Sequence, residues 1–131
     1  MIVVDASTVV SALSGIDDAS SRAHAVVSAD PDWVVPEHWT VESFSAIRGL
    51  ALGKKVSGDH AASLLRRLLE LTVESVPVDL LIPRMWQLRE SFTAYDAAYV
   101  ALAESRGLTL VTSDVRLARA AVPYCRVELI A

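Results

Sequence analysis

The sequence predicts an α/β fold built on a parallel sheet, and three observations support that prediction. Short β-branched runs recur along the chain, and longer stretches with helical spacing separate them. Strands that alternate with helices pair in parallel through right-handed crossovers, which place helices on both faces of the sheet. The first run, Ile2-Val3-Val4, is wholly apolar, as is typical of a central strand. We therefore expect a three-layer α/β/α arrangement with about five strands.

The expected elements follow one another without a repeat or a flexible linker. Strands are expected at residues 2–4, 33–35, 76–78, 109–112 and 126–130. Helices are expected at residues 7–14, 19–29, 38–53, 58–72, 79–91, 95–106 and 115–121. The five prolines and five glycines are scattered between these segments, so we expect one domain spanning residues 1–131.

Three helix starts carry recognisable capping residues. Asp5 directly follows the first strand and can accept hydrogen bonds from the N–H groups of the next helix. Thr93 and Asp96 have the spacing of a capping box, and Asp114 stands just before the helix at 115–121. These residues support the boundaries given above.

Composition limits the possible partners and location of the chain. Sixteen acidic and twelve basic residues give a net charge of −4, so overall charge does not attract nucleic acid, and any RNA must be bound locally. One cysteine, Cys125, excludes an internal disulfide, and neither a signal peptide nor an apolar run of about 18 residues is present. We therefore expect a soluble protein of the cytoplasm that does not enter a membrane.

An apolar excess suggests a protein partner. The hydrophobic fraction is 53% and the mean hydropathy is +0.39, which is high for a small monomer. A leucine stripe at residues 64–71, together with Val26 and Val27, is wider than one helix normally buries within its own domain. We expect this stripe to contact a partner, although a thick internal core is the alternative.

Four carboxylates occupy positions where a site can form. Sites in open α/β sheets lie beyond the carboxyl ends of the strands, where Asp5 and Asp114 are expected. Asp96 begins a helix that faces the same edge, and Glu42 lies one turn into the helix after Pro36. Taken singly, the aspartates read as helix caps and Glu42 as a solvated side chain. Their shared edge favours a common site.

Such a cluster requires neutralisation. Two carboxylates about 5 Å apart repel by roughly 3 kcal/mol at an effective dielectric near 20. Either protons or a hard cation must relieve this repulsion, and oxygen-only ligands favour Mg²⁺ or Mn²⁺ over zinc.

With these residues in view, the sequence resembles the PIN-domain ribonucleases, and within them the VapC-type toxins of bacterial toxin–antitoxin pairs. The similarity covers the whole chain in order, and no single piece of it is specific alone. The matching pieces are Val3-Val4-Asp5-Ala6-Ser7, Pro36-Glu37 with Val41-Glu42 and Ala46, Tyr95-Asp96-Ala97-Ala98-Tyr99-Val100-Ala101-Leu102-Ala103-Glu104, and Leu110-Val111-Thr112-Ser113-Asp114 with Arg116-Leu117-Ala118.

The resemblance implies a PIN-like fold and a metal-dependent endoribonuclease. It implies that Asp5, Glu42, Asp96 and Asp114 are the metal-binding acids, with a hydroxyl group from Ser113 or Thr112 nearby. Mg²⁺ or Mn²⁺ would polarise the scissile phosphate and activate a water for in-line attack. The implied partners are the RNA substrate, a cognate antitoxin that blocks the site, and a second copy of the chain in a homodimer.

Several neighbouring side chains have two interpretations. Arg116 follows Asp114 and either grips an RNA phosphate or is an ordinary solvated arginine. His38 lies one turn before Glu42 and could face the site, but a partly exposed histidine at a helix start is the favoured reading. Trp39 could stack on a base, but an aromatic on the inner face of a helix is usually part of the core.

Two other functions fit parts of the sequence. A phosphoacceptor receiver domain has a similar size and an acidic pocket, but it needs paired acids after the first strand and a late lysine. Here Ala6 follows Asp5, and the only lysines are Lys54 and Lys55. A catalytically silent PIN-like binding module is the other alternative, although such loss of activity usually shows as loss of one of the acids.

Overall fold

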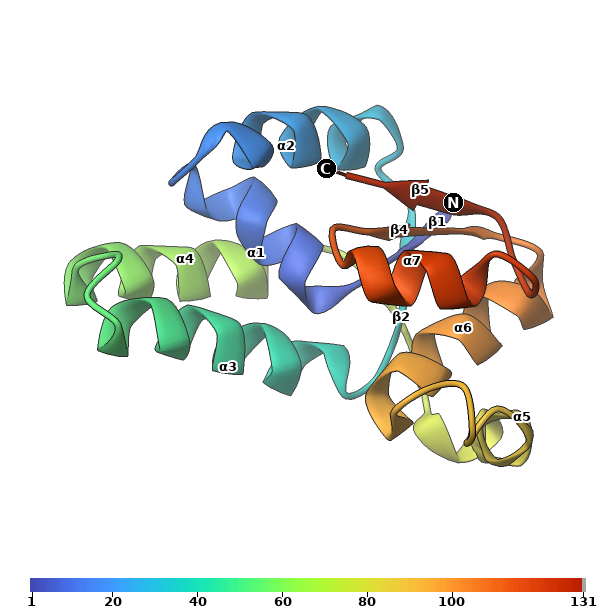
Figure 1. Ribbon diagram of the computed structural model, residues 1–131. Coiled ribbons are helices and arrows are strands. Elements are labelled where there is room, and N and C mark those ends of the chain that lie inside the picture. The colour runs from blue at the N-terminus through green and yellow to red at the C-terminus, as the bar shows by residue number, and fades with distance from the viewer. Residues whose placement is uncertain (131) are drawn as a thin grey trace.

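The computed structural model describes residues 1–130, which form a five-stranded parallel sheet flanked by helices (Figure 1). The strands are β1 (Ile2–Val4), β2 (Trp33–Pro36), β3 (Glu74–Val76), β4 (Thr109–Thr112) and β5 (Val127–Leu129). Their order is β3-β2-β1-β4-β5, and every neighbouring pair is parallel. The predicted α/β class, the parallel sheet and the central place of the first strand are confirmed.

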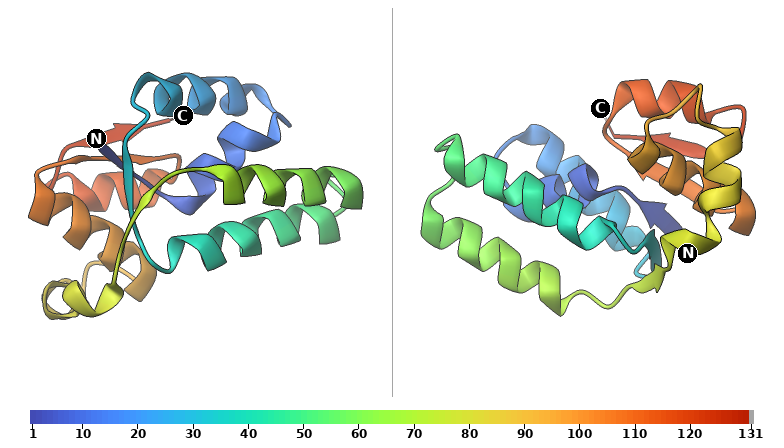
Figure 2. Two further views of the ribbon diagram at one scale, coloured as in Figure 1. Left: turned by 180° about the vertical axis from the view of Figure 1, so that it is seen from behind. Right: turned by 90° about the horizontal axis from the view of Figure 1, so that it is seen from below.

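The helices divide between the two faces of this sheet. They are α1 (Ala6–Ser14), α2 (Asp18–Ala29), α3 (Trp39–Leu52), α4 (Gly58–Glu70), α5 (Ile82–Gln87), α6 (Ala94–Arg106) and α7 (Val115–Ala121). In Figure 1, α1 to α4 lie on one side and α5 to α7 on the other. Seen from behind, α3 and α4 form an antiparallel pair (Figure 2). This is the expected three-layer arrangement.

The third strand and the stretch after it differ from the sequence prediction. The strand ends at Val76 rather than beginning there, and Val78 opens a short 3₁₀ helix, η1 (Val78–Leu80). The strand was expected two residues too late because β3 is an edge strand whose residues Glu74 and Ser75 are exposed, so pairing with β2 rather than an apolar pattern selects it.

The single helix expected at residues 79–91 is also wrong. The helical part is limited to α5, with Pro83 in its first turn, where a missing N–H costs nothing. Residues 89–92 form turns instead, closed by hydrogen bonds such as that from the Phe92 N–H to the Leu88 carbonyl at 3.1 Å.

The middle of helix α6 is buried on every side. Every residue from Ala97 to Ala103 is at most 2% exposed, and the helix packs across β2, β1 and β4. A helix that is apolar on all sides belongs inside the core. Its alanines let the helix approach the sheet closely. The first turn of α6, which carries Asp96, is thereby fixed at one end of the sheet.

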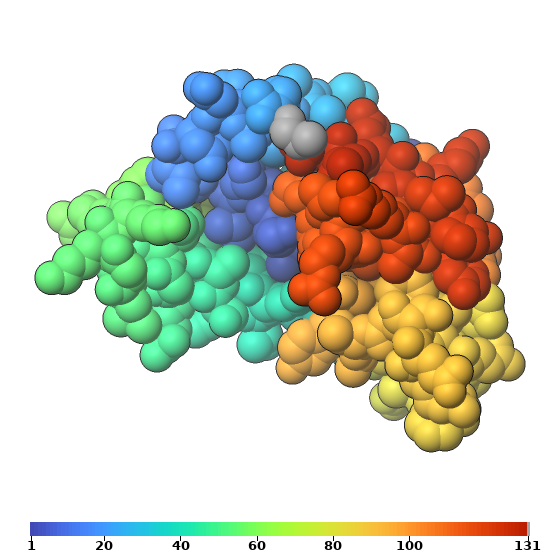
Figure 3. Space-filling view, in the orientation of Figure 1, coloured from blue at the N-terminus to red at the C-terminus, as the bar shows by residue number. Residues whose placement is uncertain are grey.

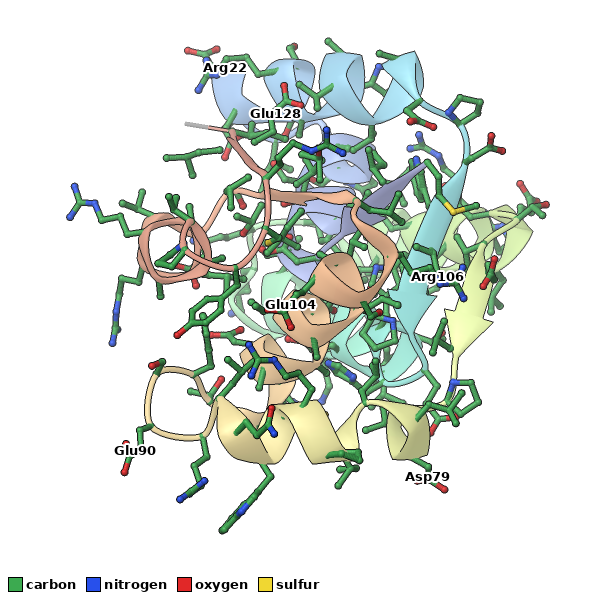
Figure 4. All side chains as sticks on the ribbon, turned by 90° about the vertical axis from the view of Figure 1, so that its right-hand side faces the viewer. Arg22, Asp79, Glu90, Glu104, Arg106 and Glu128 are labelled. Atoms are coloured by element: carbon green, nitrogen blue, oxygen red, sulfur yellow. The ribbon has the colours of Figure 1, made fainter. Side chains whose placement is uncertain are left out.

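Ion pairs tie the periphery to this buried helix. Arg84 of α5 donates two hydrogen bonds, at 2.7 and 2.9 Å, to the two carboxylate oxygens of Glu104. Arg106, at the end of α6, pairs with Glu74 of β3, and Figure 4 labels both Glu104 and Arg106 on this side of the molecule. Two-point arginine–carboxylate contacts fix orientation better than single ones, so α5 is held on α6.

The leucine stripe serves mainly the internal core. Leu64 and Leu68 are 1% and 4% exposed, and only Leu69, at 77%, faces solvent. Six of the exposed large apolar side chains lie on α3 or around α5: Val41, Phe44, Leu52, Leu80, Ile82 and Trp86. The alternative of a thick core therefore describes most of the stripe. Within residues 1–130, no helix has the length and apolarity needed to cross a bilayer.

Candidate active site

Four helices begin at the same end of the sheet, where β1 and β4 finish. The starts of α1, α3, α6 and α7 converge there in Figure 1, and the space-filling view shows the α1–α4 half meeting the α6–α7 half along this line (Figure 3). Asp5 and Asp114 directly follow β1 and β4, while Glu42 and Asp96 lie in the first turns of α3 and α6. Each predicted acid is therefore at or next to a helix start on this edge.

Asp5 is a buried carboxylate with most of its hydrogen-bonding capacity used. It is 5% exposed, and its Oδ1 accepts bonds from the Thr8 N–H at 2.9 Å and the Ser7 hydroxyl at 3.2 Å. Its Oδ2 accepts a bond from the Thr112 hydroxyl at 2.5 Å. Burial raises the pKa of Asp5, and these hydrogen bonds offset part of that rise. Asp5 is thus a helix cap and also a carboxyl group at the site.

Thr112 links the two aspartates that follow the strands. While its hydroxyl donates to Asp5, the same oxygen accepts a bond from the Asp114 N–H at 3.0 Å. The N–H of Ser113 donates to the Thr8 hydroxyl at 3.0 Å, and the Ser113 hydroxyl lies 3.4 Å from that of Ser7. Thr112 is therefore the candidate hydroxyl residue in direct contact with Asp5, while Ser113 contacts Ser7 and Thr8.

Asp114 is an exposed cap of α7. Its Oδ1 accepts bonds from the N–H groups of Arg116 and Leu117 at 2.9 and 3.2 Å. A cleft of about 360 Å³ lies between α6 and α7, and Asp96, Asp114 and Arg116 line it together. Arg116 therefore lies where an anion entering the cleft would meet a positive charge.

Asp96 is the acid with the fewest hydrogen-bond donors. Its N–H donates to the Thr93 hydroxyl at 3.4 Å, so Thr93 is the cap of α6, and within residues 1–130 no well-formed hydrogen bond reaches the Asp96 carboxylate. Burial raises the pKa of Asp96, the nearby Thr93 side chain partly lowers it, and the negative charges of Asp114, Glu42 and Asp5 raise it further. The other three acids are thus close enough for their charges to act on Asp96.

Glu42 is held by two side chains. Its Oε1 accepts a hydrogen bond from the Tyr99 hydroxyl at 2.7 Å, and the Nε2 atom of His38 lies 3.3 Å from the same oxygen without hydrogen-bond geometry. Burial alone would raise the pKa of Glu42, but His38 and Tyr99 outweigh it and the pKa lies below its ordinary value.

Two positions add to the sequence analysis. His38 immediately precedes α3 and is partly exposed, as favoured, but its side chain also stacks on Tyr95 with ring centroids 5.1 Å apart and faces Glu42. Tyr99 was missed as a site residue. The available signal was its place three residues after Asp96 on one helix, where a buried hydroxyl needs a polar partner. Trp39 is 2% exposed and belongs to the core, as favoured.

The donor set suits a magnesium-type ion. No group of three His, Cys, Asp or Glu side chains within residues 1–130 is arranged to hold a metal ion by itself. Mg²⁺ does not need one, because it usually keeps several waters and binds through one or two carboxylates. Asp96, with its unpaired and repelled carboxylate, and the remaining lone pairs of Asp5 fit that role.

Comparison with known proteins identifies the family. The PIN domain family model matches residues 2–123. Ribonuclease VapC9 of Mycobacterium tuberculosis is 35% identical over 130 residues, which cover 99% of this chain and 98% of that protein. Ribonuclease VapC12 of the same organism is 33% identical over 131 residues and the full length of both chains.

Solved structures share the fold. PAE2754 from Pyrobaculum aerophilum matches with a TM-score of 0.63 and 26% identity over 91% of this chain and 78% of that one. Mycobacterium tuberculosis VapC20, described as a sarcin-ricin loop cleaving toxin, matches with a TM-score of 0.64 over 84% of this chain and 87% of that one, and at 16% identity it supports the fold alone. The family model and the full-length relatives confirm the resemblance, and the chain belongs to the PIN domain family, among the VapC ribonucleases.

Proposed function

We propose that this chain is a Mg²⁺- or Mn²⁺-dependent endoribonuclease that hydrolyses RNA phosphodiester bonds and acts as the toxin of a toxin–antitoxin pair. The observation that carries the proposal is the electrostatic state of Asp96, whose pKa is raised by burial and by three neighbouring carboxylates. A divalent cation relieves that repulsion. The relatives named as VapC ribonucleases support RNA as the substrate.

Each acid has a proposed role. Asp5 and Asp96 are the direct metal ligands, Asp114 contacts the metal directly or through water, and Glu42 orients or deprotonates the attacking water. When bound, the cation polarises the scissile phosphate and lowers the pKa of a coordinated water. No protein nucleophile is required.

The other side chains prepare the site. Thr112 fixes the orientation of Asp5 through its hydroxyl group, which limits the positions of the Oδ2 lone pairs. Arg116 lies in the cleft with Asp96 and Asp114 and is proposed to bind a phosphate of the RNA. The N–H groups that begin α1 and α7 already donate to Asp5 and Asp114, which leaves Arg116 as the anion-binding group.

The proposed protein partners are a second copy of the chain and a cognate antitoxin, and the proposed location is the cytoplasm. The exposed apolar side chains on α3 and around α5, including Phe44, Ile82 and Trp86, support a protein interface. Burying such a surface against a second copy would remove it from water.

A catalytically silent PIN-like module is the second candidate, and one experiment separates the two. Total RNA is incubated with the purified protein in EDTA, Mg²⁺ or Mn²⁺, and the new RNA ends are mapped. We expect discrete cuts only with a divalent cation, and none with Asp96→Asn. A parent protein that never cuts would support the silent module. The receiver-domain alternative lacks support. It needs a lysine late in the chain, but Lys54 and Lys55 lie in the turn between α3 and α4.

A further inference from the structure

A buried tyrosine anchors the one glutamate of the site. Tyr99 lies on α6 and Glu42 on α3, 57 positions apart in the sequence, and the phenol donates to Oε1 at 2.7 Å. Tyr99 is 1% exposed, whereas the Glu42 side chain is 32% exposed. The rigid partner of this pair is therefore the tyrosine, and the glutamate is the group whose position is set.

The phenol is the donor in this pair, because a carboxylate oxygen can only accept. Burial raises the pKa of Tyr99 far above its ordinary value, and the charges of Glu42 and Asp5 raise it further. The bond from Tyr99 to Glu42 is therefore one between a neutral phenol and a carboxylate.

The hydrogen bond leaves one glutamate oxygen available. Tyr99 and His38 both approach Oε1, while Oε2 has no hydrogen-bond donor within residues 1–130. A free glutamate at a helix surface samples many rotamers, and fixing one oxygen removes most of that freedom. The charge of Glu42 nevertheless reaches Asp96, since it contributes to the raised pKa of that residue.

We infer that Tyr99 is a positioning residue that fixes the Glu42 carboxylate through Oε1, so that Oε2 is held ready for the attacking water and the cation. This inference rests on the proposed function and assigns a role that the four acids alone do not explain. The competing account is that the tyrosine only satisfies its own buried hydroxyl and stabilises the fold.

The test removes the hydroxyl alone. Tyr99→Phe is compared with Tyr124→Phe, a partly buried tyrosine that packs against Phe92 with ring centroids 5.7 Å apart, outside the acid site. We expect Tyr99→Phe to lower kcat on a defined RNA by about 10–100-fold and to weaken Mn²⁺ binding, measured by calorimetry without RNA, by about tenfold. KM should change by less than about threefold, because substrate contacts remain. Tyr124→Phe should match the parent in all three quantities.

A double mutant distinguishes positioning from folding. If Tyr99 acts through Glu42, adding Tyr99→Phe to Glu42→Gln should lower kcat and Mn²⁺ affinity no further than Glu42→Gln alone. If Tyr99→Phe lowers kcat and Mn²⁺ affinity by the same factor in the Glu42→Gln variant as in the parent, the inference is overturned. A Tyr99→Phe variant that has a lower Tm but keeps the parent kcat and Mn²⁺ affinity would also overturn it.

A shortened side chain keeps the inference testable if Tyr99→Phe does not fold. Glu42→Asp retains the charge but withdraws the carboxylate from the phenol, so its kcat should fall by the same 10–100-fold, and a parent-like kcat would overturn the inference. Failure of the proposed function looks different. In that case the parent itself neither binds Mn²⁺ nor cuts RNA.

Discussion

The Thr112 hydroxyl donates to Oδ2 of Asp5 at 2.5 Å, and these two residues are 107 positions apart in the sequence. Both are buried, at 0% and 5% exposure, and the same hydroxyl oxygen also accepts the Asp114 N–H. One side chain on β4 therefore satisfies the acid that ends β1 and the acid that begins α7. The bond connects the two central strands at the point where the proposed chemistry takes place.

We expect Thr112→Val to destabilise the protein by about 1–3 kcal/mol, because it leaves the buried Asp5 oxygen and the Asp114 N–H without their partner. Urea unfolding in EDTA measures this change. Thr112→Ser retains the hydroxyl and is the matched control, with a much smaller expected loss. Equal stability of the valine variant and the parent would show that the bond contributes nothing net.

We expect Asp96→Asn to abolish RNA cleavage by several orders of magnitude while the fold survives, as for loss of a metal ligand. In EDTA its Tm should equal or exceed that of the parent, because one of four repelling charges is gone. Mn²⁺ should raise the Tm of the parent but not of the variant. Asp79→Asn, an exposed acid of η1 that Figure 4 labels, is the control and should behave as the parent.

Asp5→Ala should behave differently from Asp96→Asn, since Asp5 also caps α1 through the Thr8 N–H. Loss of the cap should cost about 0.5–2 kcal/mol in EDTA, measured by urea unfolding, in addition to the loss of cleavage. Asp5→Asn keeps an oxygen for the cap and should recover part of that stability but none of the activity. Cleavage by Asp5→Asn at the parent rate would remove Asp5 from the ligand set.

The pH dependence of the metal-free protein follows from the raised pKa of Asp96. The native state holds this proton above the ordinary pKa of 3.8, so stability should fall as the pH rises from 3.8 through the raised pKa, and it should be regained below that window. Asp96→Asn should lack this part of the profile.

Glu42 changes the stability in the opposite direction. Its pKa is lowered, so the stability it contributes above 4.5 is lost as the pH falls through its native pKa. Unfolding curves in EDTA across acidic pH, for the parent, Asp96→Asn and Glu42→Gln, separate the two contributions.

Light scattering at micromolar concentration should show at least a dimer. Trp86 is 66% exposed on α5, with the Arg89 guanidinium 4.1 Å from its ring centroid, and Trp86→Ser should weaken the assembly. Leu69→Ser is the control, because Leu69 is 77% exposed but lies on α4 rather than on α3 or α5. A clean monomer of the parent would contradict the homodimer proposal.

Local signals in the sequence identified most of the sheet. β1 and β4 are short, apolar and followed directly by an acid, so both their pairing and the edge position of Asp5 and Asp114 were predictable. β3 was placed too late, because an exposed edge strand carries little apolar pattern.

Contacts between distant segments could not be predicted from the sequence. The bond between Tyr99 and Glu42 depends on how closely α6 and α3 approach, and nothing in the local pattern of either helix records that distance. The capping and site readings of Asp5 looked like alternatives in the sequence, but the structure shows one carboxylate in the capping position with a second oxygen bound by Thr112.

The density of packing around α6 also determines where the proposed activity can be lost. Its run from Ala97 to Ala103 has no exposed face, and the same helix carries Asp96 at its start and Tyr99 in its second turn. Ala101 is 2% exposed, so we expect an added methyl group there to displace packed neighbours, at a cost of about 1–3 kcal/mol. In a genetic selection for cells that survive expression of this ribonuclease, escape mutations should therefore accumulate at these alanines as well as at the acids.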